Sequence, residues 1–172
     1  MTILKKILLL RSTPWLILLI LFPAFSLSAQ TAEELDTLLE TQELSAAGAA
    51  RFVLGAADLL PPELSGADAQ TAAYEMAKAQ GWITLPAGDG LTLKDAAWLV
   101  MNAFNIEGGM MYSLFPGPRY AYREMIYRKL IQGRADPDMG VSGQRLLQII
   151  GRTQSYSGKA FLDDLHTTGG AN

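Results

Sequence analysis

The amino-acid sequence predicts a mainly α-helical protein built from three similar units. Thr92 is followed by apolar residues four and five, then seven and eight positions later, the spacing of a helix with one buried face. Asp95, three residues after Thr92, completes a capping-box pattern. The same apolar spacing follows Ser45, 47 residues upstream, and Ser142, 50 residues downstream. Recurrence at a near-constant interval indicates an internal repeat, although many helix N-termini share such a pattern by chance.

The first 29 residues have the composition of a secretory signal peptide. Basic residues up to Arg11 precede an apolar run at 15–22, which Pro23 ends, and small residues follow at 26–29. The uninterrupted run is shorter than the roughly 20 residues that a membrane-spanning helix needs. We therefore expect residues 1–29 to be cleaved and the chain to be exported to the periplasm or cell envelope. An uncleaved membrane anchor is the alternative.

The repeat domain is expected to cover residues 30–152, and its first unit, about 31–58, is the shortest. A capping-box pattern at Thr31 predicts a short helix, and the Ser45 helix follows it. The tandem prolines at 61 and 62 end this unit, because proline cannot continue a helix.

The second unit, about 65–105, and the third, about 119–152, share one order of elements: helix, short extended piece, turn rich in Gly and Asp, then a second helix. In the second unit Ser65 precedes the first helix, Gly81 is placed to end it in a left-handed conformation, and the turn lies at 86–90.

The third unit has its turn at 136–140, with a connection two residues longer, and its second helix follows Ser142. The segment 107–118 between these two units is apolar but contains many helix breakers, which predicts either a packed loop or an exposed adhesive one. Residues 153–172 are predicted to be a polar, partly disordered tail with one weak helical segment.

This repeat resembles the S-layer homology repeat. Residues 74–83 leading to 88–92, and 122–131 leading to 136–138, carry the resemblance, which covers residues 31–152. It implies three repeats in a domain with pseudo-threefold symmetry, whose second helices form a central three-helix core. It also implies a module that holds envelope proteins on cell-wall glycan.

In that arrangement the three second helices meet at a common axis and bury their apolar faces. The residues expected there are Ala49, Phe52, Val53, Ala96, Leu99, Val100, Leu146, Ile149 and Ile150. The family's glycan-binding motif is Thr-Arg-Ala-Glu. At the matching positions this chain has the hydroxyl residues Ser45, Thr92 and Ser142. The second position of the motif, directly after each of them, is not an arginine.

A helix in the third unit carries the best candidate binding surface. Its apolar residues recur at helical spacing, so a row of Arg and Tyr is expected on the opposite face. Guanidinium groups beside aromatic rings suit an anionic or glycan ligand. The candidate residues are Arg119, Tyr120, Arg123, Tyr127 and Arg128.

Two alternatives apply to these candidate residues. The helix face could simply be solvated, with Glu124 and Arg128 forming an ion pair four residues apart. Trp82, beside the Gly81 turn, is a further candidate that could stack on a sugar ring, although it could also be a packing residue.

The composition argues against catalysis and against a metal site. The chain has no cysteine and a single histidine, His166, in the predicted tail. The 136–140 turn fails as an EF-hand loop, because Val141 and Leu147 stand where glycine and glutamate are required. We therefore expect no enzymatic activity, no metal and no cofactor.

The charge is unevenly distributed along the expected mature chain. Residues 30–110 hold 3 basic and 12 acidic residues, whereas residues 111–172 hold 8 and 5. Export argues against nucleic acid as the target of the basic half. We expect a non-catalytic module that binds cell-wall polysaccharide or peptidoglycan and touches a membrane only peripherally. The alternative is a structural or assembly protein of the periplasm whose repeats bind another envelope protein.

Overall fold

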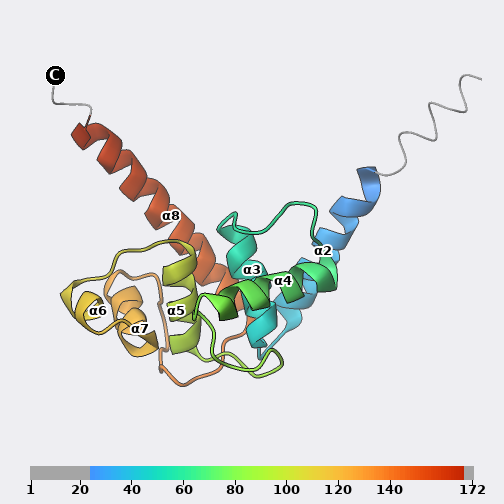
Figure 1. Ribbon diagram of the computed structural model, residues 1–172, viewed down its shortest axis with the longest axis horizontal. Coiled ribbons are helices and arrows are strands. Elements are labelled where there is room, and N and C mark those ends of the chain that lie inside the picture. The colour runs from blue at the N-terminus through green and yellow to red at the C-terminus, as the bar shows by residue number, and fades with distance from the viewer. Residues whose placement is uncertain (1–23, 169–172) are drawn as a thin grey trace, which may run out of the picture. The chain divides into compact units, whose positions relative to one another are not determined.

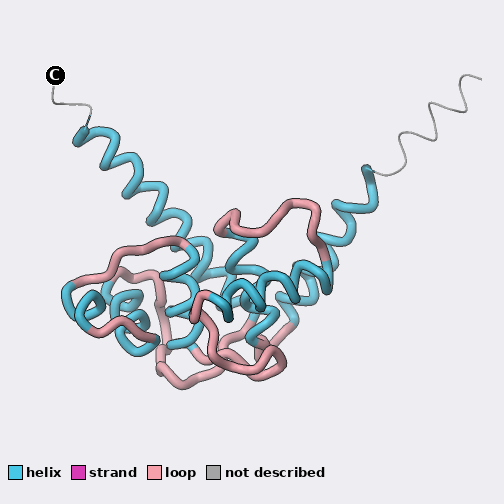
Figure 2. The backbone as a smooth tube through the Cα atoms, in the orientation of Figure 1, coloured by secondary structure: helices cyan, strands magenta, loops and turns pink. Residues whose placement is uncertain are grey.

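Helices dominate the part of the chain that this computed structural model describes, residues 24–168 (Figures 1 and 2). These residues form seven helices and no sheet, so the mainly α prediction is confirmed. The helices are α2 (Ala24–Glu40), α3 (Ala46–Ala56), α4 (Gly66–Ala79), α5 (Leu93–Ala103), α6 (Met110–Leu114), α7 (Pro118–Tyr127) and α8 (Gly143–Thr168).

The chain divides into two compact parts, residues 1–36 and 37–172, a division different from that into the three predicted repeat units. Residues 1–23 of the predicted signal peptide lie outside the described part. The helix predicted to start at Thr31 starts instead at Ala24, because no proline or glycine interrupts the sequence after Pro23. No helix within residues 24–168 is both long enough and apolar enough to cross a bilayer.

The helices α3, α5 and α8 begin where the hydroxyl residues predicted. The Ser45 Oγ accepts a hydrogen bond from the Gly48 amide at 3.2 Å, and the Ser142 Oγ accepts one from the Arg145 amide at 3.3 Å. The capping box at Thr92 is wrong in detail: Thr92 precedes α5, but its Oγ1 donates to the Asp95 carboxylate instead of accepting from the backbone.

The residues just before these caps are joined by backbone hydrogen bonds into a closed ring. The Leu91 amide donates to the Leu44 carbonyl at 2.8 Å, and the Val141 amide donates to the Leu91 carbonyl at 3.1 Å. The Leu44 amide then donates to the Val141 carbonyl at 2.9 Å. All three residues are buried, so without these hydrogen bonds their backbone amide and carbonyl groups would have no partner.

Beyond this ring, α3, α5 and α8 contact one another pairwise (Figure 1). All the side chains expected on their shared faces are buried except Phe52, which is half-buried and packs at the edge of the core. Each large apolar side chain buried there contributes on the order of 1.5–3 kcal/mol. The remaining long helices cover this core from outside, since α4 packs against α3 and α7 packs against α5.

Four helices end at a residue in the left-handed conformation. These residues are Asp58 (φ 55°), Gly81 (φ 71°), Asn105 (φ 48°) and Lys129 (φ 61°). The ends of α4 and α7 match in detail, because the Trp82 amide donates to the Ala77 carbonyl and the Leu130 amide to the Met125 carbonyl. Lys129 therefore corresponds to Gly81.

The last helix continues where the other two core helices stop. Ser155 lies 50 residues after Asn105, yet it is helical and its Oγ donates to the Gly151 carbonyl at 2.9 Å. Thr153 is buried and Tyr156 packs against the core. The predicted polar tail is thus helical as far as Thr168.

Gly143 provides a test of how tightly α8 is seated. A Cβ added at this position would overlap the backbone carbonyl of Leu38, whereas a Cβ on Gly151 of the same helix would meet nothing within 4 Å. We expect Gly143→Ala to lower the free energy of unfolding by about 1–3 kcal/mol through overpacking. Gly151→Ala should raise it by about 0.5–1 kcal/mol through helix propensity. Urea titrations of the two variants measure both changes, and equal stability would show that α8 is not held against Leu38.

Candidate functional site

The candidate surface on α7 is oriented largely as the sequence predicted. Met125 is buried and α7 packs against α5, while Arg119, Arg123 and Tyr127 are exposed. The side chains of Arg119 and Arg123 make no hydrogen bond or ion pair to another described residue. Two free guanidinium groups four residues apart therefore lie on one helix face.

Tyr120 differs from these exposed neighbours. It is half-buried, and its ring stacks on Phe115 with the ring centroids 6.0 Å apart and the planes inclined by 26°. Phe115 directly follows α6, so this contact joins α6 to the first turn of α7. A ligand on this surface can therefore reach only part of the Tyr120 ring.

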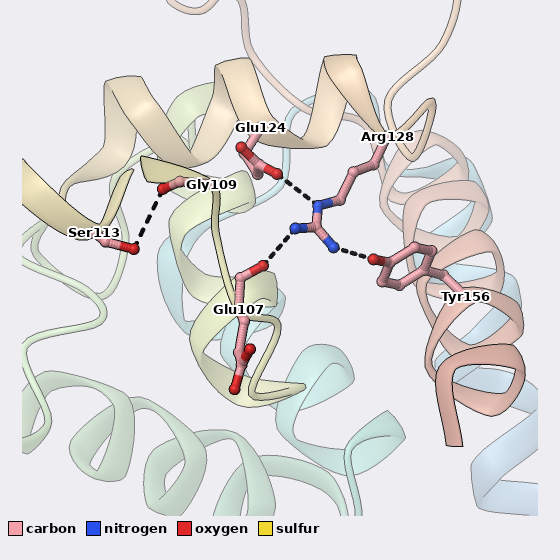
Figure 3. Close-up of polar contacts among 6 residues, drawn as sticks. All are labelled: Glu107, Gly109, Ser113, Glu124, Arg128 and Tyr156. Atoms are coloured by element: carbon pink, nitrogen blue, oxygen red, sulfur yellow. Dashed lines mark hydrogen bonds and ion pairs between the residues drawn. The ribbon is translucent and has the colours of Figure 1, made fainter. Parts of the chain in front are cut away.

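Arg128 is not free for a ligand, because its guanidinium group joins three parts of the fold (Figure 3). Its Nε donates to the Glu124 carboxylate at 2.7 Å, and its Nη2 donates to the Glu107 carbonyl at 2.6 Å. Its Nη1 donates to the Tyr156 hydroxyl, and the guanidinium carbon lies 5.1 Å from the centre of the Tyr156 ring. The ion pair considered as the alternative from the sequence is present and belongs to a larger network.

This network also positions the short helix α6. Arg128 fixes the carbonyl of Glu107 just before α6, and the Ser113 Oγ donates to the Gly109 carbonyl at 3.3 Å (Figure 3). The 107–118 segment, predicted to be a loop, thus contains the short helix α6, whose residues are exposed except for the half-buried Tyr112.

Trp82 lines a small cavity of about 180 Å³ between the turn after α4, the helix α5 and the start of α7. Trp98 lines it too, and its Nε1 donates to the Gly81 carbonyl at 3.1 Å. Asp95 also lines this cavity, and Pro118 lines it from the α7 side. Two indole rings and a carboxylate can contact the C–H faces and the hydroxyl groups of a sugar.

Tyr112 of α6 supports the outer side of Trp98. The two ring centroids are 5.9 Å apart in a tilted arrangement. Burial raises the pKa of the Tyr112 phenol above its ordinary value of 10.0, so this ring stays neutral at physiological pH.

A second cavity of about 470 Å³ lies between the end of α7 and α8. Arg128, Lys129 and Arg152 contribute positive charge to its lining, and Tyr156 contributes an aromatic ring. This cavity lies between the turn after α7 and the core helix α8, just as the first cavity lies between the turn after α4 and the core helix α5. No feature of the sequence interpretation indicated it.

Among residues 32–158, whose side chains the structure describes, no three His, Cys, Asp or Glu side chains are grouped so that they could hold a metal ion. Comparisons of the chain with protein-family models, with curated proteins and with solved structures find no match. The assignment of a function therefore depends on the geometry of the two cavities and of the α7 surface.

Replacing Arg128 tests its structural role. Arg128→Ala removes the partner of the largely buried Glu124 carboxylate, whose side chain is 15% exposed, and frees the Glu107 carbonyl. We expect the free energy of unfolding to fall by about 2–3 kcal/mol. Arg128→Lys should restore little of it, because an ammonium group cannot reach three acceptors in the same directions.

The matched control is Arg123→Ala on the same helix, which should change the stability by less than about 0.5 kcal/mol. Urea unfolding of the three variants measures the difference. If Arg128→Ala is as stable as Arg123→Ala, the network contributes nothing and Arg128 returns to the set of candidate ligand-binding residues.

Proposed function

We propose that this chain is a non-catalytic, exported module of the cell envelope that binds cell-wall glycan or peptidoglycan. In this proposal its three units are S-layer-homology-like repeats related by pseudo-threefold symmetry. The closed ring of Leu44, Leu91 and Val141 supports that arrangement, because one residue from the same place in each unit makes the same backbone contact. The matching ends of α4 and α7 support it independently.

The observation that carries the ligand assignment is the pair Trp82 and Trp98 in one cavity beside the start of α7. The cavity volume of about 180 Å³ is below the roughly 300–1,000 Å³ of sites that enclose a small molecule. It suits a single sugar ring of a polymer that otherwise lies on the surface. Pro118 lines the cavity and Arg119 follows it directly, so a chain leaving the cavity meets the cationic face of α7.

The chemistry divides between the two parts of this surface. The indole rings pack against the C–H face of a sugar, and Asp95 accepts hydrogen bonds from its hydroxyl groups. The exposed guanidinium groups of Arg119 and Arg123 pair with carboxylate or phosphate substituents further along the polymer. Arg128 takes no part, because each of its three guanidinium nitrogens already donates a hydrogen bond within the fold.

The second candidate is a structural or assembly protein of the periplasm whose repeats bind another envelope protein. The exposed apolar side chains of α6 favour it, since exposed apolar patches mark surfaces that contact another molecule. Cosedimentation with purified cell wall separates the two candidates, because an assembly protein would stay in the supernatant.

Variants of the two parts of the surface test the glycan proposal. Trp82→Ala and the double variant Arg119→Ala, Arg123→Ala should each reduce cosedimentation at least tenfold, while thermal unfolding of the double variant stays nearly unchanged. Binding through the arginines should also weaken between 0.1 M and 1 M salt, because the Debye length falls from about 10 Å to about 3 Å.

The control removes the same charge elsewhere. Lys78→Ala combined with Arg134→Ala neutralises two exposed side chains outside α7 and should leave cosedimentation unchanged. Wall binding that survives in both the Trp82 variant and the Arg119, Arg123 variant would contradict the proposed site.

A further inference from the structure

The short helix α6 exposes an unusual amount of apolar surface. The side chains of Met110, Met111, Leu114 and Phe115, here named the α6 patch, are 75%, 49%, 62% and 57% exposed. Four neighbouring apolar residues rarely stay in water on a folded domain unless they contact another molecule. The wall-binding surface proposed above uses none of them.

Cationic and aromatic groups border the α6 patch. The helices α6 and α7 are in contact and lie side by side in Figure 1, and Phe115 stacks on Tyr120 of α7. Between residues 110 and 134 the chain has five basic residues and one acidic residue, Glu124. That carboxylate is paired with Arg128, so no free acid on this segment offsets Arg119 and Arg123.

The composition of the α6 patch and of its border favours a lipid surface as the partner. The side chains of the patch line neither of the two cavities described above. A protruding set of Met, Leu and Phe flanked by Arg and Tyr is typical of segments that dip into a lipid interface. The flanking arginines attract anionic headgroups while the apolar side chains enter the acyl boundary.

We propose that α6 and the exposed face of α7 dock this protein on an anionic phospholipid surface. The α6 patch enters the interface, and Arg119 and Arg123 contact the headgroups. This contact needs no spanning helix and is separate from the Trp82 cavity. Since Arg128 binds the Glu107 carbonyl before α6 and Phe115 after α6 stacks on Tyr120, the α6 patch is presented without a conformational change.

The test uses the whole chain, which has no native cysteine, so one introduced cysteine carries one label. An environment-sensitive fluorophore is attached at Leu114→Cys and, in a second sample, at Met76→Cys on α4, which is also partly exposed. Each sample is mixed with vesicles of zwitterionic phospholipid, or of the same lipid with one third anionic phospholipid. A nitroxide-labelled lipid reports contact with the acyl region by quenching.

The expected result is a blue shift and nitroxide quenching at position 114 with anionic vesicles only, and no change at position 76. Salt at 1 M should reverse the change at position 114, because that salt concentration screens the attraction of the arginines. Arg119→Ala with Arg123→Ala should raise the lipid concentration for half-maximal change by about tenfold or more, since each basic residue near an anionic surface contributes to binding.

Three outcomes would overturn the proposal. The label at position 114 could stay in water on anionic vesicles, or it could respond equally to zwitterionic ones. It could also become buried without vesicles as the protein concentration rises, which would assign the α6 patch to a second protein molecule. Trp82→Ala should leave the vesicle response intact, so a failure of wall binding and a failure of lipid docking are distinguishable.

Discussion

The three backbone hydrogen bonds that join Leu44, Leu91 and Val141 are the constraint on which the rest of the structure depends. Each core helix starts two residues after a member of this ring, and a helix start leaves several amides without an internal partner. Carbonyl groups from distant segments of the chain satisfy the first of them. The Ala46 amide donates to the Asp89 carbonyl at 2.8 Å, the Leu93 amide to that of Met139 at 2.9 Å and the Gly143 amide to that of Thr41 at 3.0 Å. Since each helix start is completed by a segment that is far away in the sequence, the starts of α3, α5 and α8 stabilise one another.

The candidate sites follow from this arrangement. The ring fixes the direction of α5, and α5 then places Trp98 against the turn after α4, which completes the small cavity with Trp82. Because α7 packs on α5, its outer face with Arg119 and Arg123 lies next to the same cavity. Binding groups from different helices thus meet because these helices share one core, and the proposed glycan site lies between the turn after α4, the helix α5 and the start of α7.

Local signals in the sequence predicted the helix starts at Ser45 and Ser142, the left-handed end at Gly81 and most of the buried faces of the core helices. They did not predict that α7 ends at Lys129. Glycine is the usual residue at a left-handed helix end, so a lysine in that conformation cannot be recognised from the sequence. Arg128 was misjudged for a different reason. Its partners Glu107 and Tyr156 lie 21 and 28 residues away, so only the folded chain shows that its donors are used. The cavity shared by Trp82 and Trp98 and the continuation of α8 likewise depend on tertiary packing, which periodicity does not report.

Hydrogen exchange of three backbone amides tests the closed ring most directly. In NMR of the isotopically labelled chain, the amides of Leu44, Leu91 and Val141 should exchange only through global unfolding, with the same free energy of opening and the same dependence on denaturant. That result follows if the three hydrogen bonds are broken only together. If one of the three amides exchanges through a local opening of much lower free energy, the ring is not closed in solution and α3, α5 and α8 are not joined at their starts.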